Sequence, residues 1–156
     1  MFKRIASLLL ILGIVMLPVI TVRADEITTQ ERILERAYEQ VGDRYVWGAG
    51  STGEDPDSFD CSSLIQWLFR GEGIELPRCS NEQKNCGYEV NMAELQPCDI
   101  ITFVTNNSRG GDVTHVALYI GDGKILHARN SRMGVRIDDY NDYWQSITYN
   151  CRRIIN

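Results

Sequence analysis

The segment from Thr114 to Ala128 constrains the fold most, because it alternates like two β-strands around a glycine-rich turn. Residues 114–120 are expected to form one strand, residues 121–123 the turn, and residues 124–128 the returning strand. The only two histidines of the chain, His115 and His127, fall on opposite arms of this predicted hairpin. The hairpin therefore decides whether the two imidazoles can meet.

The length of the turn sets the faces of both histidines, because side chains alternate along a strand. A three-residue turn would pair Ala117 with His127 and Ile120 with Lys124. The two histidines would then lie diagonally on one face, roughly 7–8 Å apart by backbone spacing. A two-residue turn would pair Leu118 with His127 and separate the rings. We expect an odd-length connection or an equivalent bulge.

The two faces of the first strand differ in character, and this predicts their surroundings. The face that carries the histidines and Ala117 is expected to look toward the helix that begins at Cys61. The opposite face, formed by Val116, Leu118 and Ile120, is expected to be buried core.

Cys61 is predicted to lie in the first turn of a helix. Asp60 is a good N-cap, and apolar residues then recur with helical spacing up to Phe69, before Gly71. A thiol has an unperturbed pKa of about 8.5, which a helix N-terminus and an imidazolium can lower to roughly 3.5–7.5. A nucleophilic thiolate is therefore expected. The alternative is a small buried cysteine that only packs the helix.

Several motifs together resemble the NlpC family of bacterial cell-wall cysteine endopeptidases, over about Ile33 to Ile155. The residues that carry the resemblance are Tyr45-Val46-Trp47-Gly48, Phe59-Asp60-Cys61-Ser62, Leu76-Pro77-Arg78, Leu95-Gln96-Pro97, His115-Val116 and the run from Gly121 to Ala128. Three positions depart from the family pattern, because Ala49, Ser63 and Cys98 stand where glycine is usual.

The resemblance implies a papain-like α+β fold and hydrolysis of peptidoglycan stem peptides, typically after γ-D-glutamate. Cys61 would be the nucleophile, His115 the general base and His127 the group that orients His115. The resemblance also assigns substrate-binding positions to Tyr45, Asp60 and Ser62. It implies no metal and no cofactor.

The first 24 residues have the pattern of a secretory signal, with Lys3 and Arg4, an apolar stretch from Leu8 to Ile20 and Val22-Arg23-Ala24 as the cleavage site. A membrane anchor is the alternative, although the stretch is short for a span. We expect residues 1–24 to be removed, leaving a secreted, monomeric single domain over 25–156 without a stable membrane anchor.

The charge of the chain excludes nucleic acid as an expected partner. The full sequence has a formal net charge of −5, and losing the three basic residues of the signal would take it to −8. Such an acidic protein is not expected to bind nucleic acid, nor to adhere to an anionic cell wall by charge alone. The partner that the family resemblance implies is a peptidoglycan peptide.

The other cysteines and several charged residues have simpler expected roles. In a secreted chain, Cys79, Cys86, Cys98 and Cys151 predict two disulfides of undetermined pairing, with four reduced core cysteines as the alternative. Ser80-Asn81-Glu82-Gln83 is a capping-box pattern that predicts a short helix. The two arginines after His127 are expected on the solvated surface, with binding of a stem-peptide carboxylate as the alternative. The expected surface residues are Arg129 and Arg132, and a solvated acidic loop is expected at Asp138, Asp139 and Asp142.

Three alternative functions stay open at this point. A related cysteine amidase of the CHAP type would cut between sugar and L-alanine. A zinc site could use Cys61, His115 and His127, although a fourth ligand with the usual spacing is missing. A catalytically idle wall-binding domain is the third.

Overall fold

The computed structural model of the protein describes residues 27–50, 56–105 and 110–155. The expected signal peptide lies outside these residues. None of the helices in the described part of the chain has the length and apolar character that crossing a membrane would need.

The described residues form four α-helices, one 3₁₀ turn and eight strands. The helices are α1 (Thr29–Glu39), α2 (Cys61–Arg70), α3 (Ser80–Gln83) and α4 (Asp142–Ser146), with the 3₁₀ turn at Met92–Glu94. The strands are β1 (Arg44–Tyr45), β2 (Ser58–Phe59), β3 (Tyr88–Val90), β4 (Ile100–Phe103), β5 (His115–Gly121), β6 (Lys124–Ala128), β7 (Val135–Asp139) and β8 (Thr148–Arg153).

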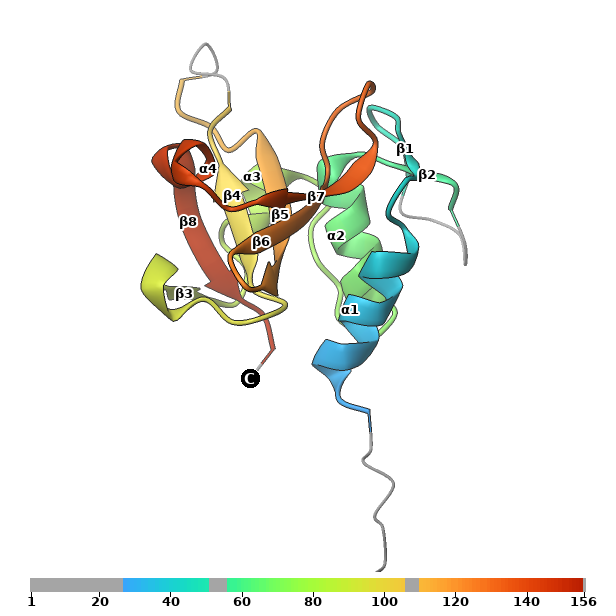
Figure 1. Ribbon diagram of the computed structural model, residues 1–156, viewed down its shortest axis with the longest axis horizontal. Helices are drawn as coiled ribbons and strands as arrows, with labels where there is room; N and C mark the ends of the chain where they lie inside the picture. The colour runs from blue at the N-terminus through green and yellow to red at the C-terminus, as the bar shows by residue number, and fades with distance from the viewer. Residues whose placement is uncertain (1–26, 51–55, 106–109, 156) are drawn as a thin grey trace, which may run out of the picture.

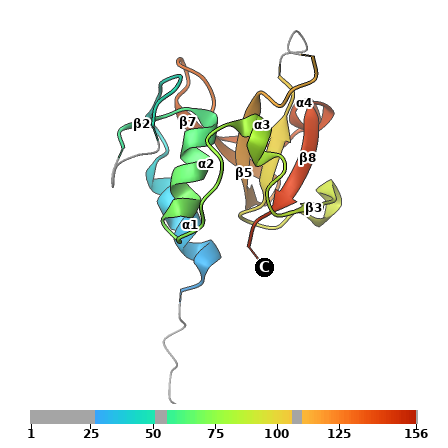
Figure 2. The same cartoon turned by 180° about the vertical axis from the view of Figure 1, so that it is seen from behind.

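Six of the strands form one antiparallel sheet in the order β3-β8-β4-β5-β6-β7, and β1 and β2 form a short parallel pair beside it. The long helices α1 and α2 lie side by side along the sheet, and α3 connects α2 to the sheet region (Figures 1 and 2). Helices packed on an antiparallel sheet confirm the predicted α+β class.

Two apolar clusters, on opposite faces of the sheet, hold the layers together. The larger cluster joins α1 and α2 to β5 and β6, and its members include Ile33, Leu64, Leu68, Val116, Leu118 and Leu126. The smaller cluster includes Phe103, Ala117, Ile125 and Trp144. Every residue from Cys61 to Phe69 is buried, so α2 is enclosed on all sides and has little freedom to move.

The loop after α1 covers the outer edge of β7, the last strand of the sheet. Val135 exchanges backbone hydrogen bonds with Gly42 and Asp43, at 2.9 and 2.8 Å. Gly134 makes this approach possible, because it has φ +63° and a Cβ there would lie 2.3 Å from the Asp43 carbonyl oxygen. This contact connects β7 to the segment that leads into the Tyr45 motif.

The hairpin has the predicted register, produced by a bulge rather than by a three-residue turn. Leu118 pairs with Leu126, as expected, but Gly121 pairs with Lys124 after a register shift that follows Tyr119. Asp122 and Gly123, with φ +51° and +66°, form a two-residue turn of the type that twisted hairpins favour. The bulge supplies the odd residue that the two histidines need.

The prediction about the two faces of β5 is half wrong. Val116, Leu118 and Ile120 are buried as expected, but they pack in the same cluster as α2, whereas Ala117 packs with Trp144 on the other side. The reason is chemical, because a fully buried helix needs the wholly apolar face of the strand. The histidines instead have polar partners on the opposite face.

Three further expectations change. Cys79, not Ser80, precedes α3 as its N-cap and makes no capping side-chain hydrogen bond, and α3 is only four residues long. Strand β3 and helix α4 were not expected. All five cysteines lie in the described residues and all are free, so the expected disulfides are absent. Two of them could not pair across the sheet, because Cys98 lies in the larger cluster and Cys151 in the smaller.

Candidate functional site

The Asp60 side chain fixes Cys61 at the start of α2. Its Oδ1 accepts the Ser63 backbone N–H at 2.8 Å, and Ser63 Oγ accepts the Asp60 backbone N–H at 2.9 Å. This reciprocal cap confirms the predicted helix start. It holds the Cys61 thiol at the first turn, where unsatisfied backbone N–H groups gather.

The pKa of Cys61 is shifted in the direction opposite to the one that the sequence predicted. Burial raises the pKa of Cys61 to about 11, with a further contribution from the Asp60 carboxylate. Backbone N–H groups of Val116, Ser62 and Cys61 itself act in the opposite direction. The contact with Val116 places the sulfur against β5, one residue after His115.

His115 on β5 contacts His127 on β6, and His127 in turn contacts the carboxylate of Asp138 on β7. His115 Nε2 lies 2.8 Å from His127 Nδ1, and His127 Nε2 lies 3.1 Å from Asp138 Oδ2. His127 is fully buried and His115 is 6% exposed. The Trp144 ring stacks on His115 and meets His127 edge-on, which holds both rings in place.

The charge of Asp138 determines the tautomers of both rings. Hydrogen bonding to His127 holds the pKa of Asp138 well below its ordinary value, so the carboxylate only accepts. Burial lowers the pKa of His127 although Asp138 opposes this, and burial with His127 and Arg129 holds the pKa of His115 well below its ordinary value. Both rings are therefore neutral near pH 7. His127 donates Nε2–H to Asp138, His115 donates Nε2–H to His127, and Nδ1 of His115 keeps a free lone pair.

Asp138 is the residue that the sequence analysis missed. It was expected in a solvated acidic loop, but it lies on β7 with only 9% of its side chain exposed and contacts Arg129 and Arg136 as well as His127. Its neighbour Asp139 is exposed and pairs with Lys124. The alternation of β7 could have found Asp138, since His127 pairs with Arg136 and Asp138 lies diagonally on the same face.

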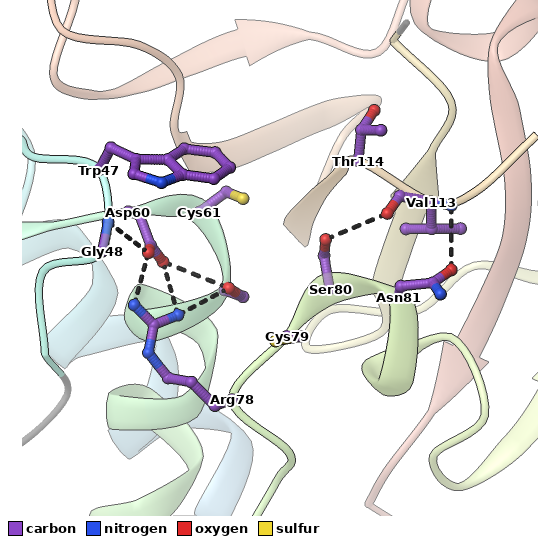
Figure 3. Close-up of a pocket in the computed structure, with 11 residues that line it drawn as sticks. Trp47, Gly48, Asp60, Cys61, Arg78, Cys79, Ser80, Asn81, Val113 and Thr114 are labelled. Carbon is purple, nitrogen blue, oxygen red and sulfur yellow. Dashed lines mark hydrogen bonds and ion pairs between the residues drawn. The ribbon is translucent and has the colours of Figure 1, made fainter. Parts of the chain in front are cut away.

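A cavity of about 410 Å³ opens beside Cys61. Its lining residues are Trp47, Gly48, Asp60, Cys61, Ser62, Arg78, Cys79, Ser80, Asn81, Val113 and Thr114. Figure 3 shows the Trp47 ring over Cys61 and the Arg78 guanidinium facing Asp60. Trp47 is 71% exposed, so it forms an open wall of the cavity rather than part of the core.

Arg78 joins the predicted substrate-binding residues into one network. Its Nη1 and Nη2 donate to the two Asp60 carboxylate oxygens at 3.0 and 2.5 Å, and Nη1 also donates to Ser62 Oγ at 3.0 Å. Burial opposes ionisation of Asp60, but Arg78 and the Ser63 N–H outweigh it and lower the pKa of Asp60. Burial raises the pKa of Tyr45 to about 12, with contributions from Cys61 and Asp60, which places its phenol in the same environment.

The arrangement does not fit the zinc alternative. His115 and His127 direct nitrogens at each other rather than at a shared point. Within the described residues, no three histidine, cysteine or acidic side chains gather in a geometry that could hold a metal ion.

Comparison with known proteins places this sequence and fold in one protein family. The chain belongs to the NlpC/P60 family, whose pattern matches residues 42–153. It is 40% identical over 134 residues to the gamma-DL-glutamyl hydrolase of Bacillus subtilis (strain 168), a match that covers 84% of this chain and 31% of the relative. It is 36% identical over 118 residues to the peptidoglycan endopeptidase RipB of Mycobacterium tuberculosis, covering 70% of this chain and 47% of the relative.

Solved structures of the same family have the same fold. NlpC2 from Trichomonas vaginalis superposes with a TM-score of 0.73 at 33% identity, covering 85% of this chain and 49% of the other. The structure of RipB superposes with a TM-score of 0.68 at 34% identity, covering 82% and 65%. The chain thus spans about a third to a half of the length of the two curated relatives named above.

Proposed function

We propose that this chain is a cysteine peptidase that hydrolyses peptidoglycan stem peptides on the carboxyl side of γ-D-glutamate. The observation that carries the proposal is the hydrogen-bonded series Asp138–His127–His115, which leaves a lone pair on His115 Nδ1. The Cys61 sulfur contacts the backbone N–H of Val116, the residue that follows His115 on β5. The names of the relatives support cleavage of this bond, since they include a gamma-DL-glutamyl hydrolase and a muramidase/DL-endopeptidase.

The reaction begins with transfer of the Cys61 thiol proton to His115 Nδ1. The sulfur then attacks the substrate carbonyl carbon, and the oxyanion forms near the first turn of α2, where the Cys61 backbone N–H can donate to it. The His115 imidazolium returns the proton to the departing amine, which leaves a thioester on Cys61. Water, deprotonated by His115, hydrolyses the thioester and restores the thiol.

His127 and Asp138 support the reaction through His115. When His115 takes the proton, its positive charge faces a neutral His127 whose other nitrogen donates to the ionised Asp138. This arrangement stabilises the imidazolium and prevents the ring from turning. Tyr45, Asp60 and Ser62, joined by Arg78, would bind the part of the peptide on the acyl side of the cut.

We further propose that residues 1–24 are a signal peptide and that the remaining domain acts outside the cytoplasm as a monomer. The substrate supports this, because relatives of the chain are named peptidoglycan endopeptidases and the cell wall lies outside the membrane.

The test is digestion of defined muropeptides, with mass spectrometry of the fragments. We expect wild-type protein to release fragments that end in γ-D-glutamate, and we expect Cys61→Ala to release none while keeping the wild-type melting temperature. Cys86→Ala is the matched control, because it removes a thiol outside the cavity, and it should cut normally. Fragments cut between sugar and L-alanine would identify an amidase instead. Turnover by Cys61→Ala at the wild-type rate would contradict the proposed mechanism.

A further inference from the structure

A second cavity of about 200 Å³ is lined in part by His115. Its lining residues are Thr105, His115, Arg129, Asn130, Tyr143 and Trp144. Thr114 lines the cavity at Cys61, whereas the next residue, His115, lines this one. Consecutive residues therefore line the two cavities, and the second cavity contacts the general base.

Arg129 provides a cation in this second cavity. Its Nη1 contacts Asp138 Oδ2, and its guanidinium lies 5.1 Å from the centre of the Trp144 ring. The side chain is 29% exposed. Among the residues that the structure describes, Nη1 is the only Arg129 nitrogen with a hydrogen-bond partner, so Nε and Nη2 can donate to a ligand.

The local charge favours an anion as that ligand. Asp138 contacts two guanidiniums, since Arg136 Nε also lies 2.6 Å from its Oδ1. Both histidines are neutral in the resting site, so one carboxylate balances only one of the two cations. A surplus positive charge beside the general base of an acidic protein would attract a carboxylate, which a guanidinium binds in a directional, two-pronged manner.

The direction of the reaction decides which part of the substrate lies there. His115 gives its proton to the departing amine, so the amino acid that carries this amine leaves on the His115 side. We propose that the second cavity binds this departing residue and that Arg129 selects one with a carboxylate beyond its backbone. The inference rests on the proposed function and adds a specificity to it.

Two sources of this carboxylate share the same chemistry. Diaminopimelate, a stem-peptide diamino acid, carries a second carboxylate at the end of its side chain, whereas lysine has none at that position. Glutamate also carries an additional carboxylate, on a shorter side chain. Tyr143 and Trp144 provide apolar surface for the aliphatic part of either side chain.

The experiment compares three peptides, L-Ala-γ-D-Glu followed by meso-diaminopimelate, L-lysine or L-glutamate. We expect wild-type protein to have a higher kcat/KM for the peptides with the extra carboxylate than for the lysine peptide. Arg129→Gln should lose about tenfold to a hundredfold of that preference, mainly through KM, which corresponds to one charge-assisted hydrogen-bonded pair. Preference for diaminopimelate but not glutamate would identify the longer side chain as the source.

Arg136→Gln is the matched control, because Arg136 also contacts Asp138 but does not line the cavity. It should change kcat/KM for all three peptides by one common factor. The inference is overturned if wild-type protein cuts the lysine peptide as efficiently as the others, or if Arg129→Gln also lowers all three equally. Cleavage of none of the peptides by wild-type protein would remove the proposed function together with this inference.

Discussion

At the scale of single residues, Asp138 has the largest consequence for the proposed chemistry. Its carboxylate fixes a proton on His127 Nε2 and, through His127, leaves His115 Nδ1 free to accept the thiol proton. Asp138→Asn keeps the size of the side chain but removes the charge, so the opposite tautomers become accessible and the imidazolium loses its counter-charge. We expect kcat on a γ-D-glutamyl peptide to fall by about tenfold to a thousandfold, in the range of changes that perturb a general base.

The neighbouring residue gives a matched control for this prediction. Asp139→Asn removes the same charge from the same strand, but Asp139 is exposed and pairs only with Lys124 among the described residues. Exposed pairs contribute little, so Asp139→Asn should keep wild-type kcat and melting temperature. Equal kcat values for the two variants would show that Asp138 does not act on the histidines.

Local patterns in the sequence predicted the parts of the site that depend on one helix or on one hairpin. The cap by Asp60 and the helical spacing after it predicted Cys61 at the start of α2, and the glycine-rich turn predicted that His115 and His127 share a face. Asp138 could not be assigned in the same way, because its contact with His127 depends on the register of a third strand. The pKa of Cys61 also escaped prediction, since it depends on how completely α2 is enclosed.

At the scale of secondary-structure elements, the β5–β6 hairpin connects register to function. The turn at Asp122-Gly123 and the bulge before it place His127 beside His115 rather than on the opposite face. Deleting Asp122 would change the register of β6 by one residue, so His127 and Leu126 would exchange faces. We expect this deletion to abolish peptide hydrolysis and to lower the melting temperature, because it also buries polar groups in the larger cluster.

The same position provides the control, because asparagine followed by glycine favours the two-residue hairpin turn that the structure contains. Asp122→Asn should therefore keep the register, the activity and the melting temperature. A deletion variant that retained full activity would contradict the link between the hairpin register and the His115–His127 contact.

At the scale of the whole molecule, the sheet separates two environments. Its α2 side holds the apolar cluster that the hydrophobic pattern predicted, and its other side holds the histidine pair under Trp144. The sequence analysis assigned the wrong face of β5 to α2, because both faces contain residues that can be buried. The choice depends on Asp138, which gives the histidines a partner only on the side away from α2.

Burial of the only two histidines makes the stability of the whole domain depend on pH. Their pKa values are lowered in the folded protein, whereas an unfolded chain has histidines near pKa 6.5. At pH values between the histidine pKa in the folded protein and about 6.5, the unfolded state binds more protons than the folded state. The free energy of unfolding therefore rises with pH and decreases as the pH falls. Each histidine contributes a slope of up to about 1.4 kcal/mol per pH unit.

We therefore expect urea unfolding at pH 7, 6 and 5 to give progressively lower free energies of unfolding. Carboxylates contribute little to this window, because the pKa of Asp138 is lowered and its stabilising effect is lost only at more acidic pH, below about 4. The double variant His115→Asn, His127→Gln removes both titrating groups. It should be less stable at pH 7 but should have a nearly flat profile down to pH 5. An equally steep profile in the double variant would mean that other groups, and not the buried histidine pair, cause the dependence on pH.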